Sequence, residues 1–336
     1  MPSFHIIDGH AVESVISSSR SRVVDWVKEA YLLHADGASV NPDSYFLNFP
    51  KKPGTRIIAL PAFLGGDYEA AGIKWVSSFP SNIERNMPRA SATLILNDYE
   101  TGYPFAFLEA SRISAARTAA SAVLGAEELT GSRSAGTITV IGAGVIARTV
   151  VEFFESREWS VDQFLIHDQK AHYMRSLAHY INSSTPYRAD TRISVESAIS
   201  GSDVVVLTTT ATTPYITQPG AFSSGQVILN ISLRDIGPEI VAASHNILDD
   251  VDHCLKANTS PHLTEQLLGH RDFIDGSLSE LMTRKVQVSE DKPKIFSPFG
   301  LGVLDLAVGL NVYQAALDRA LATEIPNFFG DLTRWP

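Results

Sequence analysis

Hydrophobic and polar positions follow two different patterns along the 336-residue chain. In the first third, apolar residues at three- and four-residue spacing predict a helix over 11–35. Residues 41–53 contain three prolines and are expected to form a loop or an edge strand. Further along, we predict strands over 56–60, 71–77, 92–97 and 104–108, a turn at 98–102 and an alanine-rich helix over 109–124. This part should be a mixed sheet with helices.

From residue 137 the pattern changes to continuous apolar strands that alternate with helices, which is typical of a parallel sheet covered on both faces. The polar stretch 130–136 separates the two patterns and is the expected domain boundary. The chain becomes helical again over 304–323, with apolar spacing suited to packing. The predicted strands are 137–141, 163–167, 192–195, 203–210, 226–232 and, as the last, 246–250, with helices from Val145 and over 171–181.

Composition and charge exclude several classes of protein. The formal net charge is −10 and no run of Lys and Arg is present, so we expect no nucleic-acid or anionic-membrane partner. No apolar run approaches the ~20 residues of a membrane helix, and the first ten residues lack the features of a signal peptide. The single cysteine, Cys254, cannot form an intrachain disulfide, which fits a cytoplasmic protein. Its neighbours Asp252 and His253 lack partners at metal-ligand spacing, so no metal site is predicted.

A glycine-rich segment is the sharpest local signal. Residues 142–147 read Gly-Ala-Gly-Val-Ile-Ala and follow a predicted strand and open a predicted helix, as the dinucleotide fingerprint requires. Gly142 would permit the tight turn and Gly144 would let the backbone approach a pyrophosphate. Ala147 is small enough for close helix–strand packing. The helix N-terminus then offers N–H groups and a positive dipole end to phosphates.

Asp168 ends the next strand and lies near the spacing expected of the acid that binds the adenosine ribose. Its carboxylate would repel a 2′-phosphate, so NAD is the predicted cofactor. The hydroxyls of Thr208–Thr210, at the end of a later strand, either contact the cofactor or simply reflect β-branched residues in a strand. The predicted cofactor-binding residues are Gly142, Ala143, Gly144, Val145, Ile146, Asp168, Thr208, Thr209 and Ser232.

Three charged residues outside the fingerprint are candidates for substrate chemistry. Lys74 stands inside an apolar strand, where an ammonium needs an anion or an outward path to water. Arg117 lies among alanines and is suited either to an anion or to a surface ion pair. Asp235 follows a strand on a loop at the carboxyl edge of the parallel sheet, as a catalytic acid or a turn residue.

The blocks 72–82, 109–122, 142–147, 231–239 and 299–310 together resemble the ornithine cyclodeaminase/μ-crystallin family over essentially the whole chain. The resemblance implies a Rossmann NAD-binding domain over 130–303. It also implies an α+β dimerisation and substrate domain from 1–129 and 304–336, and therefore a homodimer. By this resemblance the α/β chain is an NAD-dependent enzyme that acts on a small amino-acid-derived substrate.

Residues 74–80 and 89–98 are most similar to the dehydrogenases of 2,3-diaminopropionate biosynthesis, a branch found in siderophore and antibiotic pathways. The similarity implies oxidation of N-(1-amino-1-carboxy-2-ethyl)-glutamate and hydrolysis of the imine to 2-oxoglutarate and L-2,3-diaminopropionate. It also implies that Arg117 pairs with a substrate carboxylate, that Lys74 holds a second carboxylate or the hydrolytic water, and that Asp235 is the acid/base.

One departure separates the chain from the cyclodeaminases. These usually carry a further substrate-binding arginine, but residues 41–46 contain none. Whether Arg56 or Lys52 replaces it stays open at the level of sequence. The alternatives are an ornithine cyclodeaminase, an alanine or ketimine reductase, and a crystallin-like binder that catalyses nothing. The joint presence of Lys74, Arg117 and Asp235 speaks against the last by analogy.

Overall fold

The computed structural model describes residues 3–330, which fall into two compact units. Unit 1 ends at Arg117 and resumes at Leu301, and unit 2 is Thr118–Gly300. The change of unit lies inside helix α3 (Ser111–Thr130), whereas the polar stretch at 130–136 begins where this helix ends. A continuous helix can therefore belong to both units, which polarity along the sequence does not reveal.

Unit 1 is built on a mixed sheet with the strand order β16-β1-β7-β6-β5-β4-β2, and β3 adds to β4. All neighbouring strands are antiparallel except β1 and β7. The predicted edge strand in the proline-rich stretch is confirmed as β3. The strands are β1 (His5–Ile7), β2 (Ser39–Val40), β3 (Tyr45–Asn48), β4 (Arg56–Leu64), β5 (Ala70–Ser78), β6 (Ala90–Asp98), β7 (Pro104–Glu109) and β16 (Thr323–Glu324).

The helix predicted over 11–35 is wrong as one element, because two helices occupy this range: α1 (Gly9–Ser17) and α2 (Arg20–Ala35). The break falls at consecutive serines. The Ser18 hydroxyl donates hydrogen bonds to the carbonyl oxygens of Ser14 and Val15, at 2.9 and 3.0 Å. Serine side chains that bond to nearby backbone compete with helix continuation.

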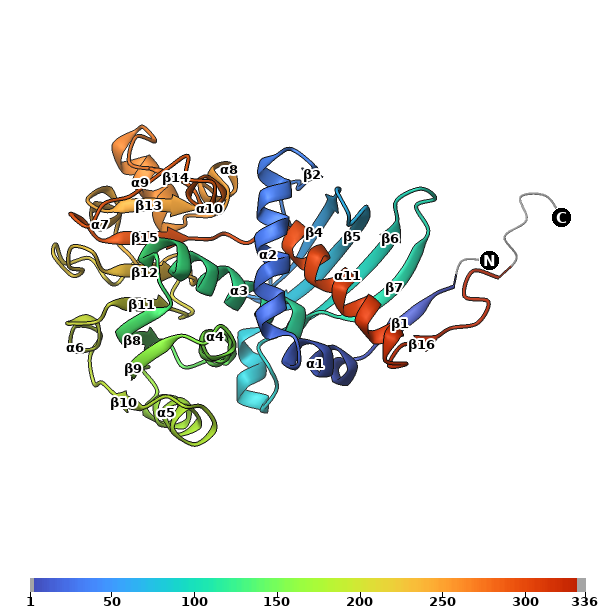
Figure 1. Ribbon diagram of the computed structural model, residues 1–336, viewed down its shortest axis with the longest axis horizontal. Coiled ribbons are helices and arrows are strands. Elements are labelled where there is room, and N and C mark those ends of the chain that lie inside the picture. The colour runs from blue at the N-terminus through green and yellow to red at the C-terminus, as the bar shows by residue number, and fades with distance from the viewer. Residues whose placement is uncertain (1–2, 331–336) are drawn as a thin grey trace. The chain divides into compact units, whose positions relative to one another are not determined.

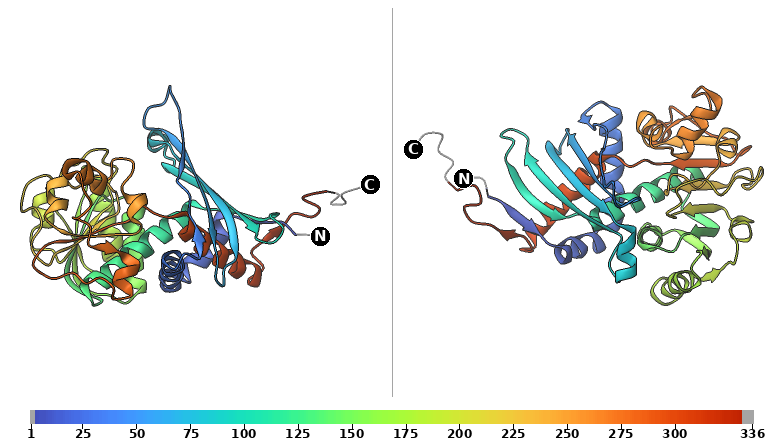
Figure 2. Two further views of the ribbon diagram at one scale, coloured as in Figure 1. Left: turned by 90° about the horizontal axis from the view of Figure 1, so that it is seen from above. Right: turned by 180° about the vertical axis from the view of Figure 1, so that it is seen from behind.

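Helices α1, α2 and the returning α11 (Gly302–Asp318) lie on one face of this sheet (Figures 1 and 2). The contact is close, since a Cβ on Gly309 would lie 2.1 Å from a methyl carbon of Leu94. The opposite face carries large apolar side chains that no described residue covers, among them Trp75 and Phe107, which are 43% and 37% exposed. Within residues 3–330, no helix is long and apolar enough to cross a bilayer.

Unit 2 is built on a parallel sheet in the order β10-β9-β8-β11-β12-β15-β13-β14. The prediction of a parallel sheet is confirmed. The strands are β8 (Ser134–Ile141), β9 (Ser160–His167), β10 (Ala189–Thr191), β11 (Val204–Leu207), β12 (Val227–Asn230), β13 (His245–Leu248), β14 (Gly276–Ser277) and β15 (Lys294–Ser297). The helices besides α3 are α4 (Val145–Ser156), α5 (Ala171–Ser184), α6 (Val195–Ile199), α7 (Pro238–Ala242), α8 (Val251–Cys254), α9 (Ser260–Leu268) and α10 (Leu278–Met282).

Three predicted strands of unit 2 need correction. The strand predicted over 192–195 is wrong, because β10 ends at Thr191 and Ser194 caps helix α6 by accepting the N–H of Ser197. Strand β11 ends at Leu207, so Thr208–Thr210 lie beyond it. The strand at 246–250 is not the last, because β15 follows it in sequence and inserts between β12 and β13. Residues 294–297 are buried, but this strand is only four residues long and begins with a lysine, so it carries no distinct apolar signal.

Candidate functional site

The glycine-rich turn of unit 2 connects β8 to α4. Gly142 has a φ of +92°, and a Cβ there would lie 2.7 Å from the carbonyl oxygen of Thr208. Both the backbone conformation and the space therefore require glycine. The Thr208 hydroxyl donates to the carbonyl oxygens of Ile141 and Gly142, at 3.1 and 2.9 Å. Thr208 thus shapes the turn, which neither of its two sequence interpretations foresaw.

The start of α4 has the features of a dinucleotide phosphate site. Gly144 is the residue before the first helical turn, and no side chain caps that turn. No atom lies within 4 Å of the Cβ position at Gly144, so the backbone is open to a ligand. The flanking residues are accessible, with Val145 70% exposed and Ile146 partly so. Uncapped N–H groups and the helix dipole favour phosphate here, so the residues fit a dinucleotide.

Asp168 lies directly beside this turn. Its carboxylate accepts the N–H of Ala143 at 2.8 Å and the N–H of Lys170 at 2.7 Å. The structure therefore brings the acid from the end of β9 to the glycine-rich turn, as the spacing in the sequence predicts.

Asp235 is the centre of a second cluster in unit 2. Its carboxylate is fully buried and accepts hydrogen bonds from the hydroxyls of Thr209 and Ser232, each at 2.5 Å, and of Tyr215 at 3.0 Å. Burial, and then the charge of Asp235, raises the pKa of Tyr215 well above its usual range, so this phenol remains a donor. Three hydroxyls hold one acceptor-only carboxylate in a fixed orientation.

Two residues that were predicted to bind NAD belong to this cluster. The hydroxyls of Thr209 and Ser232 bond to Asp235, and their contact with NAD stays a prediction. The sequence analysis did not identify Tyr215. Tyr215 lies in a loop twenty residues before Asp235. No motif or hydrophobic periodicity in the sequence connects the two residues.

Unit 1 holds a third cluster, centred on Asp305 of α11. The Lys74 ammonium donates to Asp305 at 2.5 Å and to the Ser114 hydroxyl at 3.2 Å. The Arg117 guanidinium donates to the same carboxylate at 3.4 Å. Lys74 and Asp305 are both buried, whereas the Arg117 side chain keeps 13% exposure. Lys74 therefore does not extend to water, and Arg117 is not in a surface pair.

The charges of this cluster do not balance. Lys74 and Arg117 are two cations that share one carboxylate, which leaves an attraction for a further anion. Burial lowers the pKa of Lys74 to about 8, while the charge of Asp305 opposes that shift and the charge of Arg117 adds to it. The sequence analysis missed Asp305, although an aspartate inside the apolar stretch 301–310 is a signal in itself.

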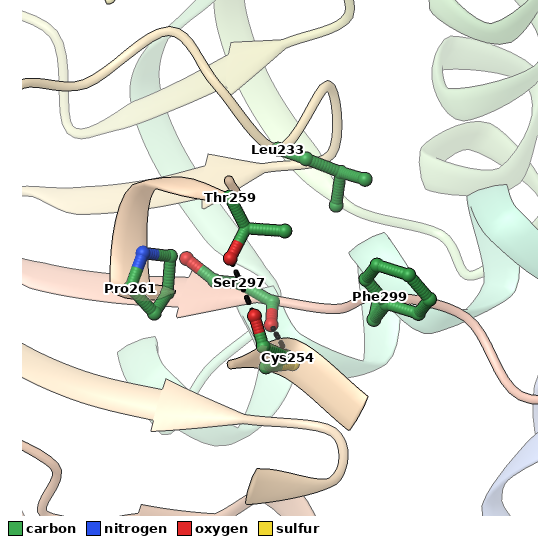
Figure 3. Close-up of a pocket in the computed structure, with 6 residues that line it drawn as sticks. All are labelled: Leu233, Cys254, Thr259, Pro261, Ser297 and Phe299. Atoms are coloured by element: carbon green, nitrogen blue, oxygen red, sulfur yellow. Dashed lines mark hydrogen bonds between the residues drawn. The ribbon is translucent and has the colours of Figure 1, made fainter. Parts of the chain in front are cut away.

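Cys254 lines a small apolar hollow in unit 2 (Figure 3). Its thiol donates to the carbonyl oxygen of Ser297 at 3.1 Å and to Asp249 at 3.0 Å. Burial raises the pKa of this thiol, which favours an unreactive structural residue. Across residues 3–330, no group of three or more His, Cys, Asp and Glu side chains is arranged to hold a metal ion.

Comparison with known proteins gives consistent results. The profile of the ornithine cyclodeaminase/mu-crystallin family matches residues 6–320. The N-((2S)-2-amino-2-carboxyethyl)-L-glutamate dehydrogenase of Staphylococcus aureus is 30% identical over 90% of this chain and 92% of its own length. Among solved structures, the Thermococcus litoralis Δ1-pyrroline-2-carboxylate reductase, in complex with NADH and L-proline, has a TM-score of 0.87 at 24% identity. That match covers 96% of this chain and 100% of the other. A dimeric archaeal alanine dehydrogenase with bound NAD has a TM-score of 0.84 at 24% identity and covers 97% and 100%.

The fold and the glycine-rich turn define a Rossmann-type dinucleotide-binding protein. The chain belongs to the ornithine cyclodeaminase/mu-crystallin family. The predictions of the family, of the α/β fold and of an NAD-dependent enzyme that acts on amino-acid CH–NH groups are confirmed by these relatives.

Proposed function

We propose that this enzyme oxidises N-(1-amino-1-carboxy-2-ethyl)-glutamate and hydrolyses the resulting imine, within siderophore or antibiotic biosynthesis. The observation that carries the proposal is the Lys74–Asp305–Arg117 cluster, whose excess positive charge suits a carboxylate substrate. The choice of substrate is supported by the full-length similarity to the Staphylococcus aureus dehydrogenase of the same compound. The products are 2-oxoglutarate and L-2,3-diaminopropionate.

The residues of unit 2 are proposed to bind NAD. Gly142–Ile146 would hold the pyrophosphate through backbone N–H groups, and Asp168 would accept the adenosine ribose hydroxyls and disfavour a 2′-phosphate. Bound NAD supplies the hydride acceptor. Thr208 and Thr209 support this site only indirectly, through the turn and through Asp235.

The remaining candidate residues are proposed to bind the substrate and to transfer its protons. Arg117 pairs with a substrate carboxylate, and Lys74 holds a second carboxylate or the hydrolytic water. Asp235 takes the proton from the substrate nitrogen when the carbon is oxidised. It returns that proton to the imine nitrogen and then accepts a proton from the water that adds to the carbon of the C=N bond. This second proton passes to the amine nitrogen as the C–N bond breaks; the primary amine leaves, and the remaining hydroxyl proton is released to solvent as the carbonyl of 2-oxoglutarate forms. The hydroxyls of Thr209, Tyr215 and Ser232 fix the orientation of this carboxylate.

The role of Asp235 can be separated from folding and cofactor binding. Asp235→Asn should abolish oxidation while the protein still binds NAD, because the amide retains the size of the side chain but cannot accept the proton. Tyr215→Phe, which removes one donor, should lower kcat by a smaller factor. An Asp235→Asn variant with the parent rate would contradict the proposed mechanism.

We also propose a cytoplasmic homodimer, with unit 1 as the dimerisation and substrate domain. The face of its sheet that carries Trp75 and Phe107 is apolar, and no described residue covers it; such faces mark interaction sites. Phe107→Glu should shift the protein to monomers in light scattering. Leu268→Glu, at a residue of unit 2 with the same 37% exposure, serves as the control and should not shift it.

A further inference from the structure

Two arginine residues lie on either side of Ser78 at one end of the sheet in unit 1. Arg56 begins β4 and is paired in register with Ser78 of β5. Arg89 immediately precedes β6, and its guanidinium donates a hydrogen bond to the Ser78 hydroxyl at 3.0 Å. Both side chains are partly buried. Ser78 thus lies between the two strands that carry the two guanidinium groups.

These two cations have no counter-charge among residues 3–330, since no carboxylate forms an ion pair with either of them. The buried Nε of Arg56 has no hydrogen-bond partner. Burial, and then the nearby charge of Arg56, lowers the pKa of Arg89. Two like charges in a partly desolvated place cost free energy unless an anion joins them. Arginine is well suited to such a role because its planar fork matches a carboxylate.

The pair lies on the same side of the sheet as Lys74. Side chains alternate between the faces of a strand, so Lys74 and Ser78 share a face of β5, and Arg56 shares it because it is directly opposite Ser78. Four residues along a strand span about 13 Å. The Arg56–Arg89 pair and the Lys74–Arg117 cluster are therefore two cationic sites on one face of unit 1.

We propose that Arg56 and Arg89 form a binding site for the distal side-chain carboxylate of the substrate, remote from the groups that Arg117 and Lys74 hold. The inference rests on the proposed function, whose substrate carries carboxylates at both ends of a chain of seven bonds. The extended chain measures roughly 9 Å between its terminal carboxyl carbons. The long arginine and lysine side chains of the two cationic sites can therefore reach its two ends. The pair thereby selects substrates with a distal acid.

The cyclodeaminases carry a further substrate-binding arginine that residues 41–46 of this chain lack, and the Arg56–Arg89 pair can take its place. Lys52 is engaged elsewhere, because its ammonium lies 5.8 Å from the centre of the Phe79 ring, a cation–π distance. Arg56 instead has a buried donor without a partner. We therefore assign the role of the missing arginine to Arg56 and Arg89. These residues lie at the start of β4 and just before β6, outside the stretch 41–46.

Direct binding of suberate, an unreactive dicarboxylate whose carboxyl carbons are separated by the same seven bonds, tests the site without catalysis. Calorimetry on the full chain should show binding that Arg56→Gln and Arg89→Gln each weaken at least tenfold, as loss of a charge-assisted hydrogen bond predicts. Arg85→Gln is the matched control and should bind as the parent does, because Arg85 is an exposed residue at the end of the short 3-10 helix (Pro80–Arg85) between β5 and β6. Failure of the parent to bind suberate, or equal binding by the pair variants, would overturn the inference.

Kinetics then separate this inference from the proposed function. With N-(1-amino-1-carboxy-2-ethyl)-glutamate, the pair variants should raise KM at least tenfold with little change in kcat. The parent should show the same rise with the side-chain amide of that substrate. If suberate binding depends on Arg56 and Arg89 but the protein does not oxidise this substrate, the anion site stands and the proposed function is rejected. A merely structural role would lower the unfolding temperature of both variants, whereas relief of charge repulsion should keep or raise it.

Discussion

Lys74 of β5 and Asp305 of α11 are 231 positions apart in sequence, yet their side chains form a 2.5 Å ion pair in the interior of unit 1. The pair exists because α11 returns across β4, β5 and β6 at the end of the chain. Arg117 donates to the same carboxylate from α3. Asp305 thereby fixes both cations that we propose to hold the substrate.

The pH dependence of substrate binding should report the charge of Lys74. Its pKa is lowered to about 8, so the ammonium is charged below that pH and neutral above it. KM for a carboxylate substrate should therefore rise as the pH passes through about 8. Initial rates between pH 6.5 and 9.5 measure this, and a KM that stays constant across the range would contradict the role of Lys74.

Asp305→Asn should shift that pH profile to lower pH. The carboxylate of Asp305 raises the pKa of Lys74 against the effect of burial, so its removal lowers this pKa further. The variant should also lose about 3 kcal/mol of stability, as expected when one partner of a buried ion pair is removed. Asp318→Asn, at the exposed end of α11, is the control for both measurements. A profile that stays in place in Asp305→Asn would show that the aspartate does not control Lys74.

The two glycines of the fingerprint should respond differently to alanine. Gly142→Ala forces a Cβ against the Thr208 carbonyl at a positive φ and should cost about 1–3 kcal/mol of stability. Gly144→Ala meets no atom within 4 Å, so folding should be preserved. NAD affinity should nevertheless fall, because the added methyl group occupies the space proposed for the pyrophosphate. Thermal unfolding and NAD titration separate the two effects. Unchanged NAD affinity in Gly144→Ala would place the phosphates elsewhere.

Asp168→Asn should relax the preference for NAD over NADP. The amide oxygen can still accept the N–H of Ala143, which Asp168 binds at 2.8 Å, so the turn should persist. The negative charge that disfavours a 2′-phosphate is lost, and the affinity for NADP should rise while the affinity for NAD changes little. A parent protein that already prefers NADP would show that the ribose assignment is wrong.

The parts of the structure that depend on local sequence could be predicted. The fingerprint, the helix after it and Asp168 are recognised because their spacing is set within a single β-α-β unit. The buried strands of unit 2 are recognised from their continuous apolar runs. The break between α1 and α2 was missed because the apolar residues on its two sides, Ile16 and Val23, are seven positions apart and therefore keep the helical phase.

The contacts of the site could be predicted only in part. Lys74 and Arg117 were found as charges in apolar surroundings, but their shared partner Asp305 required the return of α11. The pairing of Arg56 with Arg89 requires the register of three strands. Side-chain hydroxyls such as those of Thr209 and Ser232 can satisfy a carboxylate or a ligand equally well, and sequence does not distinguish these partners.

The most direct test of the proposed function is to incubate the purified protein with NAD and N-(1-amino-1-carboxy-2-ethyl)-glutamate, with ornithine in a parallel sample. NADH absorbance and the amount of 2-oxoglutarate are followed together. We predict equal amounts of NADH and 2-oxoglutarate from the first sample and neither product from the second. No NADH from the first sample, with proline and ammonia from ornithine, would contradict the account and identify a cyclodeaminase.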